Sequence, residues 1–513
     1  MLHHWSATLT SPWLPLATIA LLVCLLSRQR VRVRVLSWVG QAVLPHSHPI
    51  RDSRGKPIQG PPWQWPDGQM VDKFLAARQC SLRWHRYGPV YRIWASAISE
   101  LVITTPGDVK QFYSDGHQHR KAESSNAGWL FRQVLGQCVG LLNGRDWRRV
   151  RSHIEFPLSY RATMARLDEI LHEAHDYLQG DFLQYADKST QDASCLIVNP
   201  VHALQWYPFF HMASLFYGAL DADERAELQR IGQLRGDLFR DAVQGGMVNR
   251  YGMLSRLLRT SASKKSDRFV REWHAFNVNM YRKHLRTKSD APIGTIWAAT
   301  EKNRVTSTEI LHSMDEMLFA NLDVTTHVLT WAVVLLAQHP SSQRELRREI
   351  RSYPGSEADY VNSRTTLLHN TLLETLRLRP VGAFTVPESS PEMKKLGDFQ
   401  SDVVTDLYAL HVRNPFWGGD GEDFRPLRFQ SINPRELRYN LLTFGFGPRQ
   451  CLGQHDAERT IKSLIFYLIK DYDISLRGDQ MRNGDFKVDD KNWVALSDVD
   501  LELRSGTEED MGV

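Results

Sequence analysis

Helical periodicity dominates the hydrophobic pattern of the chain. Over most of its length, apolar residues recur every three to four positions, which places them on one face of a helix. The helical segments span residues 69–87, 160–310, 308–338 and 454–472. Two short segments, 87–94 and 99–105, instead alternate or run apolar between turn residues, which predicts a pair of strands. The pattern therefore predicts a mainly α fold with a small β domain.

The N-terminal segment has a different pattern. Residues 9–26 are almost all apolar and just long enough to span a bilayer. A basic cluster follows, at Arg28, Arg30, Arg32 and Arg34. A secretory signal carries its positive charge before the apolar run, whereas a basic cluster after the run predicts a cytosolic protein body. We expect a single-pass anchor over residues 1–34, with a cleaved signal peptide or a buried helix as the alternatives.

The expected domain boundaries follow changes in composition. Residues 35–66 are rich in proline, glycine and charge, which predicts a stiff, extended linker. The globular domain is expected from 67 to 505, with a polar tail over 506–513. Near its end, residues 483–504 are expected to form a hairpin that turns near Trp493.

Composition excludes several classes of protein. A chain of 513 residues with 42% hydrophobic residues can bury a large core. The net charge of +5 gives no argument for a nucleic-acid partner, and no helix-turn-helix or zinc-finger spacing occurs. The five cysteines are scattered, which argues against a disulfide framework and a structural zinc site. Since the chain contains no P-loop and no Rossmann fingerprint, any nicotinamide reductant must bind a separate protein.

The strongest chemical signal is the stretch FGFGPRQCLG at 444–453. Its glycines and proline predict a tight turn, and a long helix follows. Cys451 stands just before that helix, where the helix dipole and loop N–H groups favour a thiolate. Arg449 supplies a planar cationic fork for a carboxylate, and Gly453 lets a flat ligand approach the backbone. A buried cysteine in a glycine-rich turn is the structural alternative.

This stretch resembles the cysteine-ligand loop of the cytochrome P-450 family, F-x-x-G-x-R-x-C-x-G. All five fixed positions match, at Phe444, Gly447, Arg449, Cys451 and Gly453. The resemblance implies a cytochrome P-450 fold with haem b, whose iron takes Cys451 as its axial thiolate ligand. It also implies that Phe444, Arg449 and Gly453 contact the cofactor.

A second segment, WRRVR, places Trp147 and Arg151 four positions apart on one helix face. It resembles the W-x-x-x-R helix of the family, which implies that both residues bind a haem propionate. Trp–Arg stacking on a helix surface is the alternative.

The apolar segment 308–338 has a polar interruption that resembles the oxygen-binding helix of the family, A/G-G-x-D/E-T-T/S. Ala320 and Asp323 match, whereas Asn321 replaces the glycine and Val324 replaces the first threonine. In the family, this threonine helps to deliver protons to iron-bound oxygen. Valine cannot relay a proton, so we expect Asp323 and Thr325 to form the proton relay. Water or a substrate hydroxyl is an alternative proton source. In the structural alternative, the hydroxyls of Thr325 and Thr326 bond to carbonyls of their own helix.

Two further motifs predict a structural triad. Glu374 and Arg377 lie three positions apart on one helix face and resemble the E-x-x-R motif. The segment FRPLRF resembles the family's F-x-P-x-R-F, which implies that Arg428 joins this pair and stabilises the haem-binding core.

In the family, the segment after E-x-x-R passes the haem and contacts substrate. The resemblance therefore implies pocket residues at Val381, Ala383 and Phe384, in addition to Ala320 and Val324 on the central helix. Many relatives place a basic residue near 387–389 to bind a propionate. This chain has Pro387, Glu388 and Ser389, so we expect that contact to be altered.

The resemblance covers roughly residues 45–505 and implies a haem-thiolate monooxygenase that uses O2. It implies electrons from NADPH through a separate NADPH–cytochrome P-450 reductase, with Arg435, Arg438 and Lys462 as candidates for its basic docking face. It further implies a single-pass protein of the endoplasmic reticulum membrane with a cytosolic catalytic domain and an organic substrate.

The substrate class stays open. The segments FANLDVTTHVLTW and GWLFRQVLGQCVGLLNGRDWRRVR resemble fungal secondary-metabolite members, and possibly those of gliotoxin-like epipolythiodioxopiperazine pathways, which oxidise cyclic dipeptides in toxin biosynthesis. A fungal terpenoid, polyketide or aromatic hydroxylase is one alternative. Others are a haem-thiolate isomerase or dehydratase that does not use O2, which Val324 keeps open, and a non-catalytic haem binder.

Overall fold

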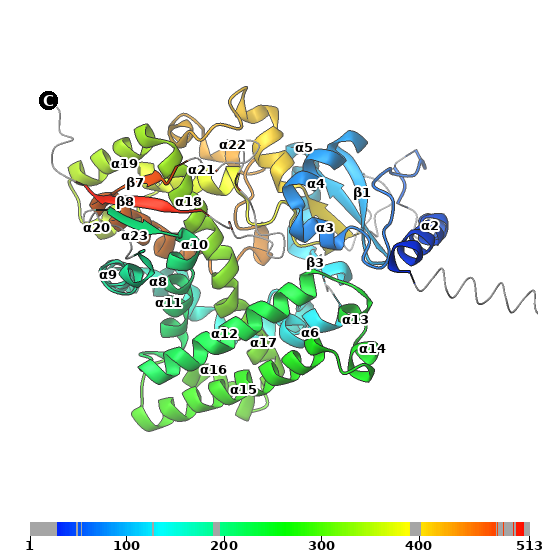
Figure 1. The fold of residues 1–513 in the computed structure, drawn as a ribbon, viewed down its shortest axis with the longest axis horizontal. Coiled ribbons are helices and arrows are strands. Elements are labelled where there is room, and N and C mark those ends of the chain that lie inside the picture. The colour runs from blue at the N-terminus through cyan, green and yellow to red at the C-terminus, as the bar shows by residue number, and fades with distance from the viewer. Residues whose placement is uncertain are drawn as a thin grey trace, which may run out of the picture.

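The computed structural model describes residues 28–47, 50–52, 54–125, 128–187, 195–389, 402–478, 480, 486, 496 and 499–506. The apolar run at 9–26 and the expected turn near Trp493 lie outside these residues. Helices make up most of the described chain, with two small sheets (Figure 1). The predicted mainly α fold with a small β domain is therefore confirmed.

The larger sheet has five strands in the order β1-β2-β6-β5-β3. The strands are β1 (Val90–Ala95), β2 (Ile98–Ile103), β3 (Arg120–Lys121), β5 (Glu388–Ser389) and β6 (Asp402–Thr405). β1 and β2 form the antiparallel pair that the sequence predicted, with Val90 opposite Ile103. β6 then joins β2 in parallel, so a segment far along the chain completes this sheet.

Three helices accompany this sheet: α3 (Met70–Leu75), α4 (Ala77–Trp84) and α5 (Pro106–Phe112). The single helix expected over 69–87 is therefore broken at Ala76, which lies outside the helical region of backbone angles. The Thr105 side chain caps α5 and Pro106 opens it, as expected for a helix N-terminus.

The remaining helices form the body of the molecule. Those before the central helix are α6 (Trp129–Leu135), α7 (Gly144–Ile154), α8 (Tyr160–Ala165), α9 (Leu167–Gln179), α10 (Pro200–Leu204), α11 (Trp206–Tyr217), α12 (Ala222–Val243), α13 (Met247–Arg250), α14 (Gly252–Leu257), α15 (Ser261–Thr287) and α16 (Ile293–Glu301). Those after it are α19 (Pro340–Ser352), α20 (Glu357–Asn362), α21 (Leu367–Leu378), α22 (Pro434–Leu437) and α23 (Gln454–Asp471).

The central helix runs through the body as α17 (Ser307–Ala320), a π-helical turn (Asn321–Thr325) and α18 (Thr326–Gln338). The sequence predicted one long helix here, and the π turn falls at the polar interruption. Within the described residues, this is the one helix long and apolar enough to cross a membrane. Because 78% of its most apolar window is buried inside the protein, it serves as a core helix.

A second sheet has three strands, ordered β4 (Cys195–Val198), β8 (Leu501–Ser505) and β7 (Tyr472–Leu476). Both edges of β8 are paired with strands that lie before residue 483. The hairpin expected over 483–504 is therefore wrong for its described end.

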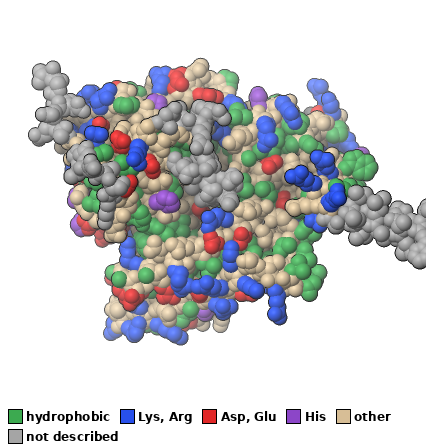
Figure 2. All heavy atoms as spheres, in the orientation of Figure 1, with side chains coloured by type: hydrophobic (Ala, Val, Ile, Leu, Met, Phe, Trp, Pro, Cys, Tyr) green, Lys and Arg blue, Asp and Glu red, His purple; other side chains and the backbone are tan. Residues whose placement is uncertain are grey.

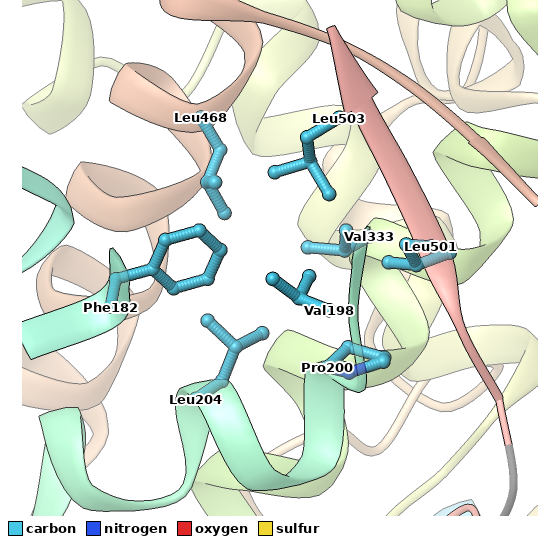
Figure 3. A pocket seen from close by; sticks show the side chains of 8 residues that line it. All are labelled: Phe182, Val198, Pro200, Leu204, Val333, Leu468, Leu501 and Leu503. Atoms are coloured by element: carbon cyan, nitrogen blue, oxygen red, sulfur yellow. The ribbon is translucent and has the colours of Figure 1, made fainter. Parts of the chain in front are cut away.

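Beside this sheet, apolar side chains surround a void of about 10 Å³ (Figure 3). They come from the sheet, α18, α23 and the α9–α10 region: Phe182, Val198, Pro200, Leu204, Val333, Leu468, Leu501 and Leu503. This volume is about that of a single water probe, so the void is a packing defect and not a substrate site.

The N-terminal part of the expected linker is helical. α2 covers Gln29–Ser47, so the expected extended spacer over 35–66 is wrong for residues 35–47. Farther on, Ile50 is 1% exposed, and the Trp63 indole donates a hydrogen bond to the Ser96 carbonyl at 2.6 Å. These parts of the segment pack against the β domain and do not act as a free spacer.

Candidate active site

The cysteine loop is a tight turn that closes on itself before α23. The Cys451 N–H donates to the Phe444 carbonyl at 2.8 Å. Gly445 and Gly447 have φ of 80° and 63°, left-handed angles that glycine adopts without strain. The glycine-rich spacing of this loop therefore serves its backbone path, and α23 starts at Gln454 as predicted.

The loop N–H groups act on the Cys451 thiol in the expected direction. Desolvation by the surrounding protein atoms is the largest effect and raises the pKa of this thiol to about 11, whereas the N–H groups of Gly453 and Gln454 lower it. A coordinated metal cation deprotonates a thiol outright, so haem iron bound at the sulfur would supply the thiolate form.

Three predicted cofactor residues meet beside this loop. The Trp147 ring of α7 contacts two guanidinium groups, with Arg449 4.8 Å and Arg151 5.1 Å from its centroid. Arg449 donates to the carbonyls of Leu142 and Gly140 at 2.8 and 3.0 Å. Arg151 pairs with Glu155 and bonds to the Pro448 carbonyl. Two cations and an indole N–H are thus gathered next to Cys451.

These residues fit a flat, anionic, iron-bearing cofactor. A Cβ at Gly453 would meet nothing within 4 Å, so the backbone there is open to a planar group. Cys451 is the one exposed cysteine of the four that the structure describes. No group of three or more His, Cys, Asp or Glu side chains suited to a metal ion occurs among the described residues. A single axial thiolate with guanidinium groups nearby is therefore the fitting donor set for haem.

The central helix has one partly open face. Within a helix whose other sides are largely buried, His312, Glu316, Ala320 and Val324 are half-buried, at intervals of four residues. We call these four residues the open stripe. Because positions four apart lie on one helix face, the stripe places the predicted pocket residues Ala320 and Val324 side by side. Asp323, also half-buried, borders it.

The π turn places the predicted relay residues Asp323 and Thr325 in different surroundings, since Asp323 is half-buried and Thr325 is buried. Thr325 is 5% exposed, and its hydroxyl donates to Asn321 Oδ1 at 2.7 Å. The Thr326 hydroxyl donates to the Asn321 carbonyl at 2.9 Å. Asn321 Nδ2 donates to the Met317 carbonyl at 2.6 Å. The helix distortion is therefore held by side chains, and the Thr325 hydroxyl bonds to a side chain and not to a helix carbonyl.

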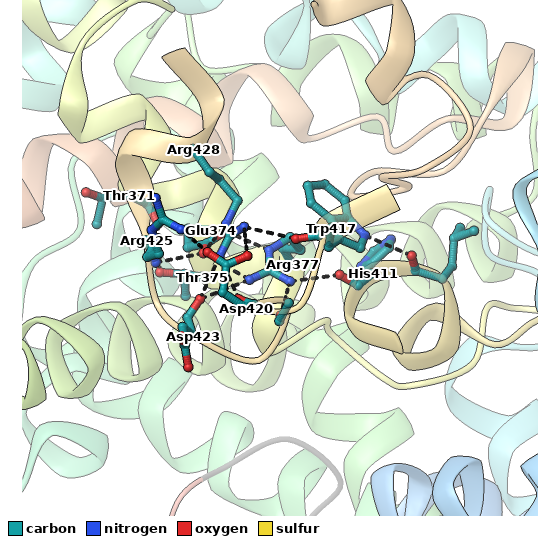
Figure 4. Close-up of polar contacts among 12 residues, drawn as sticks. Thr371, Glu374, Thr375, Arg377, His411, Trp417, Asp420, Asp423, Arg425 and Arg428 are labelled. Carbon is teal, nitrogen blue, oxygen red and sulfur yellow. Dashed lines mark hydrogen bonds and ion pairs between the residues drawn. The ribbon is translucent and has the colours of Figure 1, made fainter. Parts of the chain in front are cut away.

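The E-x-x-R triad is assembled as predicted (Figure 4). Arg377 binds both carboxylate oxygens of Glu374, at 2.6 and 2.9 Å, and Arg428 donates to Glu374 at 2.8 Å. Glu374 and Arg377 are fully buried. Arg377 also donates to the carbonyls of His411 and Gly421, which ties α21 to the segment before the cysteine loop.

The pocket residues predicted after α21 lie mostly in the core. Ala383 and Phe384 are 6% and 8% exposed, and the Phe384 ring lies 5.7 Å from that of Trp84. Both residues therefore pack in the interior, whereas Val381 is half-buried. Val386, which follows these residues, is 51% exposed.

The region expected to lack a basic partner contains an ion-paired cluster. Glu388 on β5 accepts from Lys121 of β3 at 2.7 Å and lies 3.2 Å from His119 Nδ1. Burial tends to raise the Glu388 pKa, but the hydrogen bond from His119 and the charge of Lys121 lower it overall. Sequence reasoning missed Lys121 because its partner lies far along the chain.

The prediction that Lys462 belongs to the basic docking face is wrong. The Lys462 side chain is 3% exposed, and its ammonium donates to the Ser363 carbonyl at 2.8 Å. Burial lowers its pKa to about 7, with the neighbouring charge of Arg459 adding to the effect. Lys462 therefore cannot form part of a basic surface, although Arg435 and Arg438 are exposed.

Comparison with known proteins agrees with this site. The Cytochrome P450 family profile matches residues 69–490. The cytochrome P450 monooxygenase sirC of Leptosphaeria maculans is 43% identical over 463 residues, 90% of this chain and 91% of that protein. The monooxygenases hasH and gliC of Aspergillus fumigatus are 41% and 36% identical, and the matches cover 90% and 93% of this chain and 87% and 94% of theirs.

The chain belongs to the cytochrome P450 family. It is a monooxygenase that uses haem-thiolate iron, O2 and electrons from a redox partner, and it resembles fungal secondary-metabolite enzymes. The monooxygenase assignment disfavours the isomerase, dehydratase and non-catalytic alternatives.

Proposed function

We propose that this monooxygenase inserts one oxygen atom into a cyclic dipeptide of fungal secondary metabolism, with Cys451 as the axial ligand of haem iron. The observation that carries the haem assignment is the meeting of Cys451 with the Arg449–Trp147–Arg151 stack. The substrate class is supported by the resemblance of the central-helix and α6–α7 segments to enzymes that oxidise cyclic dipeptides.

Haem, when bound, supplies the activation of O2 and the oxidation of substrate. The chain's own residues hold and orient it. Arg449 and Arg151 offer guanidinium forks to the propionates, and Trp147 Nε1 offers a further donor. Phe444 and Gly453 flank Cys451 in the loop, where Gly453 leaves room for a planar ring. Glu374, Arg377 and Arg428 hold the preceding segment in place.

Proton supply falls to the π turn of the central helix. Val324 has no exchangeable proton, so the hydroxyl nearest to it along the chain is that of Thr325, which is held by Asn321. Asp323 borders the open stripe and supplies a carboxylate at the same turn. We assign Thr325 and Asp323 to holding and moving protons, and Ala320, Val324 and Val381 to contact with substrate.

Electrons come, in this proposal, from NADPH through NADPH–cytochrome P450 reductase, and the protein sits on the endoplasmic reticulum membrane. Hydrophobic side chains gather on the surface over α2 and α13–α14 (Figure 2). The most exposed of them are Trp38 at 71%, Met253 at 87% and Leu257 at 79%. Exposed apolar groups of this kind favour an interface with lipid.

The test is a reduced carbon-monoxide difference spectrum of the membrane-bound protein and of Cys451→Ala. A thiolate-ligated haem gives a strongly red-shifted Soret band, which Cys451→Ala should lose. Cys195→Ala, at a buried cysteine elsewhere in the fold, should keep it. If the wild type binds haem without this band, the assignment of Cys451 is wrong. Turnover of a cyclic-dipeptide panel with reductase and NADPH then tests the substrate class.

A further inference from the structure

Three side chains of the central helix hold the loop between α6 and α7. The Gln137 N–H donates to His312 Nδ1 at 3.0 Å, and the Val139 N–H donates to Ser313 Oγ at 3.0 Å. The Gly140 N–H donates to Glu316 Oε2 at 2.9 Å. These bonds bring the loop against the open stripe. His312 must be neutral to accept, and burial lowers its pKa to about 4.

The position of the Glu316 carboxylate requires glycine at position 140. A Cβ on Gly140 would lie 1.8 Å from Glu316 Oε1, a distance that no real side chain tolerates. Among the described residues, the donors to this carboxylate are the Gly140 N–H and the Cys138 thiol. A carboxylate has about four acceptor sites, so capacity remains for a further donor.

Glu316 lies on the side of the helix that faces the cysteine loop. Gly140 joins the two, because its N–H donates to Glu316 Oε2 at 2.9 Å and its carbonyl accepts from Arg449 at 3.0 Å. The carboxylate therefore stands beside the cysteine loop, four residues before Ala320 on the open stripe. Burial raises the pKa of Glu316, against Gly140, Cys138 and the charges of Lys121 and Arg449, which lower it.

We propose that Glu316 is a specificity-determining residue whose carboxylate accepts a hydrogen bond from an N–H group of the substrate. A charge-assisted hydrogen bond of this kind is roughly twice as strong as a neutral one, and a buried polar group discriminates strongly against a substrate that leaves it unpaired. The ligand class is therefore a secondary amide or an amine. The inference rests on the proposed function, because it assumes that the open stripe faces the haem.

The test measures Soret shifts on titration with two matched pairs of probes. One pair is cyclo(glycyl-L-phenylalanyl), with two lactam N–H groups, and its N,N′-dimethyl derivative. The other pair is 1-(3-aminopropyl)imidazole and 1-butylimidazole, which bind iron through imidazole and differ in the amine tail. For wild type, we expect each N–H or amine probe to bind at least tenfold more tightly than its partner.

Glu316→Gln should reduce both preferences to less than threefold, with little change in the affinity for the dimethyl and butyl probes. Ser313→Ala is the matched control, because it breaks one loop bond and leaves the carboxylate in place, and it should keep both preferences. Haem content and the carbon-monoxide spectrum show that each variant is folded.

Preferences that survive in Glu316→Gln, or that Ser313→Ala abolishes equally, overturn the inference. If only the imidazole pair responds, Glu316 keeps its role and the cyclic-dipeptide class fails. If wild type shows no amine preference although its spectrum is that of a haem thiolate, Glu316 does not face the site while the haem assignment stands.

Discussion

The hydroxyl of Thr325 donates a 2.7 Å hydrogen bond to Oδ1 of Asn321, one turn earlier in the central helix. The family pattern has glycine at the position of Asn321, and its first threonine is Val324 here. The two departures are therefore linked in space, because the residue that replaces glycine holds the threonine that remains. The amide group of Asn321 also donates to Met317, which fixes its orientation inside the π turn.

We predict that Thr325→Val lowers product formation about a hundredfold, the lower end of typical proton-transfer effects. Substrate binding should change little, and hydrogen peroxide per NADPH consumed should rise. Thr326→Val is the control, since its hydroxyl only bonds to the Asn321 carbonyl. Equal peroxide yields from the two variants would assign Thr325 a structural role only. Peroxide and product assays measured together decide the matter.

Asn321→Ala should act through Thr325 and not independently. Removing the amide frees the Thr325 hydroxyl and leaves the Met317 carbonyl without its side-chain donor. We expect increased peroxide yield in Asn321→Ala, and a double variant with Thr325→Val no worse than Thr325→Val alone, because the two residues act as one unit. Additive losses in this double-mutant cycle would contradict the coupling.

The triad gives a prediction about stability. Glu374→Gln removes the carboxylate that binds Arg377 and leaves Arg428 with the Asp420 carboxylate at 3.5 Å. Breaking a buried pair costs about 3–5 kcal/mol. We expect loss of that order in the free energy of unfolding, measured by urea titration, together with low haem content. Arg425→Ala is the control, because Arg425 binds Glu374 through its backbone N–H and its side chain is exposed. A comparable loss in the control would contradict this account.

A buried histidine predicts a pH dependence. Burial of the His211 ring would lower its pKa, but the charge of Asp456 and the hydrogen bonds that the ring donates to Asp456 and Glu173 outweigh this and raise it to about 10. The ordinary value is about 6.5. The stabilisation is therefore fully present below about pH 6.5 and lost as the pH rises toward 10.

His211→Asn should accordingly lower the free energy of unfolding most at pH 6 and least near pH 10, in urea titrations across that range. The control is His172→Asn, since His172 is mostly exposed and its ion pair lies on the surface. A difference between wild type and His211→Asn that grew with pH would show that His211 is not the charged member of this cluster.

Local patterns predicted the parts of this molecule that depend on local geometry. The strand pair β1–β2, the helix after Cys451 and the facing of Glu374 and Arg377 all follow from spacing along one segment. The π turn coincides with the polar interruption at Asn321, which the sequence marked without showing its form. Helix α2 was missed because a proline-rich composition outweighed the propensity of the preceding residues.

Long-range partners could not be predicted from the sequence. Nothing near Lys121 indicates that Glu388 will pair with it, and nothing near Lys462 indicates that its ammonium will be buried against Ser363. Glu316 did carry a local signal, since it stands four residues before Ala320 on the same helix face. That signal gains meaning only when the loop at Gly140 is seen to bind it.

The contact of the Trp147 ring with two guanidinium groups leads to a prediction about the rate of haem dissociation. Arg449→Ala removes one cation of the stack and the donors to Leu142 and Gly140, so haem should dissociate at least tenfold faster, measured by transfer to apomyoglobin. Trp147→Phe keeps a ring beside the cations but loses the indole N–H, so a smaller, few-fold increase is expected.

The control is Arg148, an exposed arginine on α7 next to Trp147, and Arg148→Ala should leave the rate unchanged. If Trp147→Phe matched Arg449→Ala, the indole N–H would contribute as much to haem binding as the Arg449 cation, which contradicts the expected order. If neither variant changed the rate, the propionates would have to bind elsewhere, and Lys121 near Glu388 would be the next group to test.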